Sequence, residues 1–190
     1  GLFDYRSADN LAIVGLRTTG TDGELMLQVW GGDETVTLSG SDDGDWHHYC
    51  LTYDGSAWYL YFDGDVASSG TLAINTGSDR ALKLGMWDLS SYLDGAIDEV
   101  YVYSSALDAA SIQVLYDAVT AAPTVTPLPT SNFFQTTLVA HYSFDDGTAA
   151  EDSDGSLDGT ISGATATTGR DGSGALSFDG TDDYVDFPAA

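Results

Sequence analysis

The sequence is poor in basic residues, which narrows the classes of partner, and in glutamate, which bears on its secondary structure. Five Lys and Arg residues face 30 Asp and Glu residues, for a formal net charge of −25. The glutamates are Glu24, Glu34, Glu99 and Glu151, so nearly every acid is an aspartate. Such a charge repels nucleic acids and anionic membranes, and aspartate favours turns and calcium loops over helices. We therefore expect no nucleic-acid partner and a β-rich protein with Asp-rich loops.

Cysteine and long apolar runs are also scarce. The single Cys50 excludes an internal disulfide, and its apolar strand context predicts a small buried hydrophobe. No stretch is long and apolar enough to cross a bilayer, so membrane insertion is not expected. The chain starts at Gly1 with neither a Met nor a signal peptide. We expect a processed or excised piece of an extracellular or cell-surface protein.

Most of the remaining sequence alternates in the manner of half-buried strands. Asp54-Gly55 and Asp63-Gly64 follow apolar runs, and Asp-Gly in that position favours hairpin turns. Near residue 107 the apolar period changes to that of one short helix, Leu107–Val119, with Asp108 as its N-cap. The predicted strands before it are Glu24–Trp30, Thr35–Gly40, His47–Tyr53, Ala57–Phe62, Ala81–Trp87 and Ala96–Ser104.

A proline-containing segment divides the chain into two strand-rich parts, residues 1–119 and 137–190. Pro123, Pro127 and Pro129 exclude a helix or a central strand within residues 120–136. Interleaved Thr and Pro predict an extended linker. The linker residues Thr124, Thr126 and Thr130 are candidates for O-glycosylation.

Motifs in both parts resemble the laminin G-like domains of the concanavalin A-like lectin/glucanase superfamily. The first part contains "WHHYCLTYDGSAWYLYFDG" (Trp46–Gly64) and "LDGAIDEVYVYSSALDAASIQVLY" (Leu93–Tyr116). The second contains "LVAHYSFDDGTAAEDSDGS" (Leu138–Ser156) and "GALSFDGTDDYVDF" (Gly174–Phe187). The resemblance implies an all-β fold, a two-sheet antiparallel jelly-roll sandwich with one short helix.

The two parts stand in the reverse of the order that this family shows. Residues 1–119 resemble the C-terminal half of a laminin G-like sandwich, and residues 137–190 resemble its N-terminal half. The sandwich is therefore expected to be circularly permuted or strand-complemented, or the chain is a cut from a tandem array of such domains. Unpaired strand edges and the long linker favour pairing between neighbouring chains, which predicts a head-to-tail homopolymer of identical copies. The alternative is an intramolecular circular permutant.

No catalytic residues are expected from this sequence. Glucanases of the superfamily use paired glutamates on one strand, and Glu99 has no glutamate partner along its strand. Strand alternation places His47 and His48 on opposite faces, so they cannot chelate a metal together. We interpret them as a packed pair at the start of a strand.

A structural Ca²⁺ is the cofactor that the sequence suggests. Residues 145–159 concentrate hard oxygen ligands on a Gly-rich loop, although the spacing is not that of an EF-hand. The resemblance implies a calcium between this loop and the "IDEV" strand. The implied ligands are Asp98, Asp145 or Asp146, and a carbonyl near Gly155.

Glycans are the second class of ligand that the resemblance implies. Trp87 and Tyr92 are the candidate exposed platforms, whereas Trp30, Trp46 and Trp58 are interpreted as core residues.

The leading hypothesis is an extracellular structural subunit of a fibre or surface polymer, with strands shared between neighbours. The alternative is a lectin-like carbohydrate-binding or adhesion module.

Overall fold

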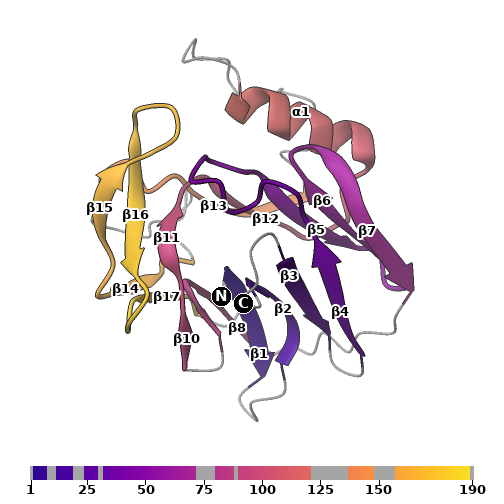
Figure 1. Cartoon of the computed structure of the whole chain (residues 1–190), viewed down its shortest axis with the longest axis horizontal. Coiled ribbons are helices and arrows are strands. Elements are labelled where there is room, and N and C mark those ends of the chain that lie inside the picture. Colours follow the sequence, from indigo (N-terminus) through magenta and orange to yellow (C-terminus); the bar gives the residue numbers. More distant parts are fainter. Residues whose placement is uncertain are drawn as a thin grey trace.

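Antiparallel strands in two facing layers, with one helix outside them, form the described part of the chain (Figure 1). The computed structural model describes residues 2–7, 12–18, 24–29, 32–71, 80–87, 90–120, 137–147 and 157–188. The predicted class is confirmed: the chain is an all-β sandwich of the jelly-roll type with one short helix. The predicted linker falls almost wholly outside the described residues, as do the glycosylation candidates Thr124, Thr126 and Thr130.

The first layer is a seven-stranded antiparallel sheet in the order β14-β17-β8-β1-β2-β3-β4. Its strands are β14 (Thr160–Ser162), β17 (Tyr184–Asp186), β8 (Arg80–Leu84), β1 (Phe3–Ser7), β2 (Ala12–Thr18), β3 (Glu24–Val29) and β4 (Gly32–Thr37). Alternation sets its inner face, because Leu25 and Leu27 of β3 are buried while Met26 between them is half-buried.

Three smaller antiparallel sheets lie opposite the first layer. One has the order β11-β16-β15, the next pairs β12 with β13, and the third has the order β5-β6-β7. Their strands are β5 (Tyr49–Tyr53), β6 (Ala57–Phe62), β7 (Asp65–Thr71), β11 (Asp94–Ile97), β12 (Val100–Tyr103), β13 (Leu138–Tyr142), β15 (Thr165–Thr168) and β16 (Gly174–Asp179). A short pair, β9 (Met86–Trp87) with β10 (Ser91–Tyr92), follows β8.

The hydrophobic core fills the space between the layers in two clusters. One joins β3 and β4 to β6 through residues such as Leu27 and Leu60. The other joins β8 and β17 to β13 and β16, and its buried members are Leu84, Ala140, Tyr142, Phe144, Leu176, Phe178, Val185 and Phe187. Each fully buried aliphatic or aromatic side chain contributes about 1.5–3 kcal/mol to folding.

Helix α1 (Ala109–Thr120) packs on the outer face of the β5-β6-β7 sheet (Figure 1). The predicted N-cap is confirmed, because the Ser111 amide donates a hydrogen bond of 2.8 Å to Asp108 Oδ1. Ile112 and Leu115 are buried against Tyr61 of β6. The predicted turn at Asp63-Gly64 is also confirmed, since both residues have the positive φ that a type I′ hairpin needs.

Strands from the two parts of the chain pair with each other. Strand β17 pairs with β8, β16 pairs with β11, and β13 pairs with β12, all antiparallel. Within the chain, these ladders fill the strand edges that a separate half-sandwich would expose. The intramolecular alternative stays a prediction. Head-to-tail assembly of neighbouring chains stays a prediction, and so does the permuted order relative to the family.

Phe178 tests whether the two parts form one cooperative unit. Its side chain is 2% exposed on β16, in the second part, and lies against Gly85 of the first. Phe178→Ala should cost about 3–5 kcal/mol. All four tryptophans precede residue 120, so their fluorescence reports the first part during urea unfolding.

We expect Phe178→Ala to lower the midpoint of that tryptophan-monitored transition. The matched control is Val66→Ala on β7, where the side chain is 51% exposed and the change should stay within about 0.5 kcal/mol. A transition that Phe178→Ala leaves unmoved would mean that the first part folds without the second.

Candidate functional site

A sharp bend at Asp98 and Glu99 lies where the chain changes strand partners. Strand β11, before the bend, pairs with β16, and strand β12, after it, pairs with β13. Glu99 has φ of 52°, in the left-handed region that non-glycine residues seldom adopt. The bend turns Asp98 toward the β15–β16 loop, where it meets the Arg170 amide, and Glu99 toward β13, where it meets His141.

Asp98 occupies a half-buried position whose hydrogen bonds are incomplete. The Arg170 amide donates to Asp98 Oδ2 at 3.1 Å. The other oxygen, Oδ1, is buried and has no hydrogen-bond partner among the described residues. A buried carboxylate oxygen without a donor costs free energy unless a proton or a cation supplies the missing interaction.

Two glycines let the loop 169–174 approach Asp98 on one side and the turn after β13 on the other. A Cβ at Gly169 would lie 2.4 Å from Asp98 Oδ2 and 2.6 Å from the Gly174 carbonyl oxygen. A Cβ at Gly174 would lie 2.3 Å from the Asp145 carbonyl oxygen and 2.5 Å from that of Phe144. The loop 169–174 is therefore packed between Asp98 and the turn after β13, and neither position has room for a side chain. We call this group of residues, 98, 144–145 and 169–174, the Asp98 cluster.

Burial dominates the ionisation of Asp98. Loss of solvation raises its pKa to about 6, and the negative charges of Glu99 and Asp171 act in the same direction. The hydrogen bond from the Arg170 amide opposes this rise but does not cancel it. Near neutral pH the cluster therefore holds a carboxylate that a nearby positive charge would stabilise.

The predicted calcium ligands are brought together only in part. Asp98 lies in the cluster, and the residue 145 contributes its backbone carbonyl, while the side chains of Asp145 and Asp146 are exposed. Gly155 lies outside the described residues. Sequence reasoning missed the loop 169–174, although its "GRDGSG" run was a signal for a tight turn near the ligands.

A polar network on the other side of the bend joins the two parts of the chain. Glu99 Oε2 accepts hydrogen bonds from the Tyr101 hydroxyl at 2.5 Å and from His141 Nε2 at 2.8 Å. The rings of Tyr101 and His141 are stacked, with centroids 4.1 Å apart and an interplanar angle of 5°. Burial is the main reason that the pKa of Tyr101 is raised, and the hydrogen bond to Glu99 adds to it. The network therefore fixes β12 against β13.

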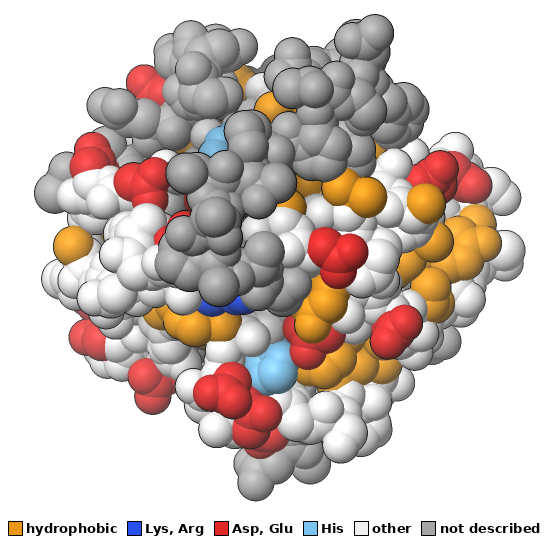
Figure 2. Space-filling model, turned by 90° about the horizontal axis from the view of Figure 1, so that it is seen from above, with side chains coloured by type: hydrophobic (Ala, Val, Ile, Leu, Met, Phe, Trp, Pro, Cys, Tyr) orange, Lys and Arg blue, Asp and Glu red, His pale blue; other side chains and the backbone are white. Residues whose placement is uncertain are grey.

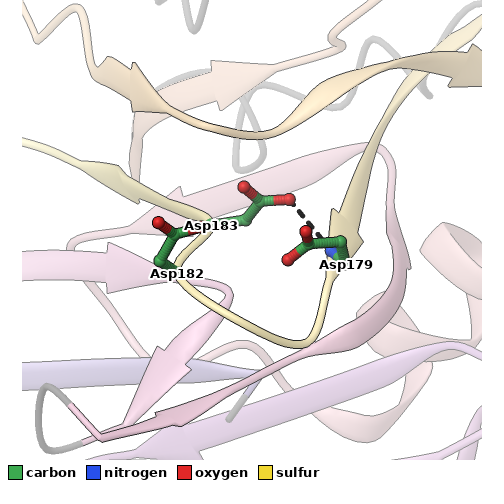
Figure 3. Close-up of side chains that lie close together, drawn as sticks. All are labelled: Asp179, Asp182 and Asp183. Atoms are coloured by element: carbon green, nitrogen blue, oxygen red, sulfur yellow. Dashed lines mark hydrogen bonds between the residues drawn. The ribbon is translucent and has the colours of Figure 1, made fainter.

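A second group of acids lies in the turn between β16 and β17. The carboxylates of Asp179, Asp182 and Asp183 lie within 4.8 Å of one another. Figure 3 shows Asp183 turned toward Asp179, and its Oδ2 accepts a 2.9 Å hydrogen bond from the Asp179 amide. Asp183 is 5% exposed and lies against Gly163, so it also shapes the turn.

The burial of the tryptophans reverses part of the sequence interpretation. Trp87 is 6% exposed and packs on Gly15, where a Cβ would lie 1.8 Å from the indole. The expectation that Trp87 forms an exposed platform is therefore wrong, and Tyr92 is only half-buried. Trp58 is a core residue as predicted, whereas Trp46 is 38% exposed and not in the core. Trp30 lies outside the described residues.

Cys50 and the histidine pair have the surroundings that the sequence predicts. Cys50 packs beside Tyr103 beneath helix α1, and burial raises the pKa of its thiol to about 12. The two histidines contact different elements. The His47 ring lies 4.9 Å from that of Phe62, and the His48 ring lies 6.0 Å from that of Tyr116. They face apart, as strand alternation predicts.

Acidic side chains are spread over the face seen in Figure 2, and very few basic ones appear there. Among the described basic residues, Lys83 is held by an ion pair of 2.8 Å with Asp186. Within the described ranges, no helix has the length and apolarity that crossing a membrane requires.

The fold and the family comparison agree. The family model for laminin G-like domains, described as the concanavalin A-like lectin/glucanases superfamily, matches residues 2–113. That is more than half of the chain, so the protein belongs to this superfamily. Laminin G-like domains are typically extracellular. Residues beyond 113 lie outside the match, and their place in the sandwich comes from the strand pairs above.

One curated relative shares a short stretch with this chain. It is the "Sushi, von Willebrand factor type A, EGF and pentraxin domain-containing protein 1" of Rattus norvegicus, 38% identical over 48 residues. The stretch covers 24% of this chain and 1% of the rat protein, so the chain matches a very small part of that relative. No solved structure matches the chain.

The hydrogen bond between Glu99 and His141 should contribute to stability across the two parts. Both side chains are partly exposed, at 29% and 23%, which limits the coupling to about 1 kcal/mol. A double-mutant cycle with Glu99→Gln and His141→Gln, measured by urea unfolding at pH 6, should give a coupling of that size. A cycle with Gln113 and Asp117 on the exposed face of α1, which also share a hydrogen bond, should give less. Additive effects at Glu99 and His141 would contradict the role assigned to the network.

Proposed function

We propose that this chain is an extracellular, non-catalytic recognition module of the lectin type, which closes its own sandwich and holds a structural Ca²⁺ in the Asp98 cluster. The observation that carries the proposal is the buried Oδ1 of Asp98, which has no hydrogen-bond partner among the described residues. The loop 169–174 beside it approaches both the Asp98 carboxylate and the carbonyls of residues 144 and 145. Asp98 belongs to the bend where both parts of the chain meet. A cation there would stabilise the closed module.

The oxygens of the cluster suit calcium. Ca²⁺ takes six to eight oxygen ligands and accepts carboxylates, backbone carbonyls and waters in a flexible geometry. Asp98 would supply the buried carboxylate, and the carbonyls of residues 144, 145 and 174, which lie around the loop 169–174, are the further candidate ligands. The side chains of Asp145 and Asp146 are exposed on the same turn as two of these carbonyls, and waters would complete the coordination. The positive charge of the bound ion would stabilise the buried carboxylate.

The hydrogen bonds of Glu99 and Asp98 favour a recognition function over hydrolysis. Retaining glycoside hydrolysis needs two carboxyl groups about 5 Å apart, facing a substrate. Glu99 accepts hydrogen bonds from Tyr101 and His141, and Asp98 accepts one from the Arg170 amide. These contacts support structural roles for both acids.

A glycan ligand is supported by the family and by the exposed aromatic residues. Among the described residues, Trp46 and Tyr59 are exposed at 38% and 41%, whereas Trp87 is buried. Exposed aromatic rings pack against the apolar faces of sugars. The net charge of −25 disfavours sulfated or uronic glycans, so neutral glycans are the proposed class.

The fibre subunit is the second candidate. The three ladders that join the two parts within one chain could instead form between neighbours, as in domain swapping. Head-to-tail strand sharing would then build a polymer from the same contacts, with no new interface.

Asp98→Asn tests the proposed cation site. Calcium should raise the melting temperature of the wild-type protein by about 5–10 °C when its concentration is about 100 times the Kd. The variant should not respond, because its amide lacks the charge. The control Asp65→Asn, at an exposed position of β7, should respond as the wild type does.

In calcium-free buffer, Asp98→Asn should no longer lower the stability of the protein relative to the wild type. Since the folded-state pKa of Asp98 is raised, the charged form destabilises the fold, and that loss develops as pH rises through about 6. At pH 7.5 the calcium-free variant should therefore be at least as stable as the wild type. Equal calcium responses in the two proteins would contradict the site. Binding to a neutral-glycan array that is lost on chelation would support the wider proposal.

A further inference from the structure

One histidine, His47, lies between two carboxylates that come from different elements. Its Nδ1 lies 2.8 Å from Asp63 Oδ2, in the turn between β6 and β7. Its Nε2 lies 3.0 Å from Asp43 Oδ1, in the loop of residues 39–46 that joins β4 to β5. The His47 side chain is 14% exposed, so water screens these contacts only partly.

The protonation of the ring decides how many of these contacts are hydrogen bonds. Ionised carboxylates only accept, so each ring nitrogen must donate if both contacts are to be favourable. A neutral imidazole carries one N–H, and its second nitrogen is an acceptor. The imidazolium satisfies both carboxylates, whereas the neutral ring leaves one carboxylate facing a lone pair.

Asp63 is held independently of His47. Its Oδ1 accepts a 2.9 Å hydrogen bond from the His48 amide, and its own amide donates to the His48 carbonyl at 2.9 Å. It also occupies the tight turn with Gly64, where both φ angles are positive. Asp63 therefore keeps its place when the ring loses its proton.

Asp43 lies in an exposed loop with weaker connections to the sandwich. The Asp45 amide donates to Asp43 Oδ1 within the loop, at 2.9 Å. Beyond that, the Tyr49 hydroxyl reaches the Ser41 carbonyl at a long 3.4 Å. Of the two carboxylates, Asp43 is the one free to move away.

We propose that His47 is a pH-sensitive latch, which fixes the loop of residues 39–46 to the Asp63 turn while protonated and releases Asp43 when it loses its proton.

The direction of the pKa shift agrees with this geometry. Burial alone would lower the pKa of His47, but the hydrogen bonds to Asp63 and Asp43 outweigh burial and raise it. A raised pKa means that closure is favoured at low pH and is lost as pH rises through the pKa of the closed state. The neighbouring titratable groups are Asp42, Tyr49 and His48. Burial lowers the pKa of His48, and the same cause raises that of Tyr49 to about 12, so neither gains charge in this range.

An NMR titration of the His47 ring with two matched variants tests the latch. Asp43→Asn removes the carboxylate that contacts the ring and should lower the pKa of His47. Asp45→Asn removes an equal charge two residues away, and its carboxylate makes no contact with the ring, so the pKa should change much less. Equal shifts of the His47 pKa in both variants would mean that this pKa responds to nearby negative charge in general and not to contact with Asp43. That result would overturn the proposal.

Hydrogen–deuterium exchange of residues 39–46, corrected for intrinsic rates, measures the release itself. In the wild type, exchange should become several-fold faster as pH rises through the measured pKa of His47. Asp43→Asn and His47→Gln should both flatten this dependence, while Asp45→Asn should keep it. Loop exchange that is independent of pH in the wild type would also overturn the latch. Neither outcome depends on calcium or on a glycan.

Discussion

The pairing of strands from the two parts of the chain is the constraint on which the rest of the structure depends. Neither part could bury the apolar cluster around Phe178 alone, because its members come from β8 in the first part and from β13, β16 and β17 in the second. Three ladders provide the backbone hydrogen bonds for this shared core. Each ladder removes an exposed strand edge, which is where sheets otherwise associate.

The bend at Asp98 and Glu99 follows from the same constraint. The chain must leave β16 and meet β13 within two residues, and the left-handed φ of Glu99 makes that change of partner. One acid of the pair is then half-buried in the Asp98 cluster, with one oxygen that has no hydrogen-bond partner among the described residues, and the other joins His141 across the two parts. The candidate site thus lies where the fold is most constrained, so a bound cation would stabilise the closed module as well as the loop.

Local features of the structure were predictable from the sequence, and non-local ones were not. Strand β6 occupies the predicted residues 57–62, and the N-cap at Asp108 and the turn at Asp63-Gly64 arise from chemistry within a few residues. Trp87 was misjudged because its burial depends on Gly15, some seventy positions earlier. Asp98 was predicted as a ligand, but its hydrogen bond from the Arg170 amide depends on the loop 169–174, which no local pattern connects to it. Which chain supplies each strand is equally non-local, since the same ladder fits a strand from either source.

The mass of the protein in solution tests the central claim most directly. If the two parts pair within one chain, light scattering coupled to size exclusion should give 20.0 kDa at every concentration, with and without calcium. A mass that grows with concentration, in multiples of that value, would show that the ladders form between chains and would restore the fibre as the leading interpretation.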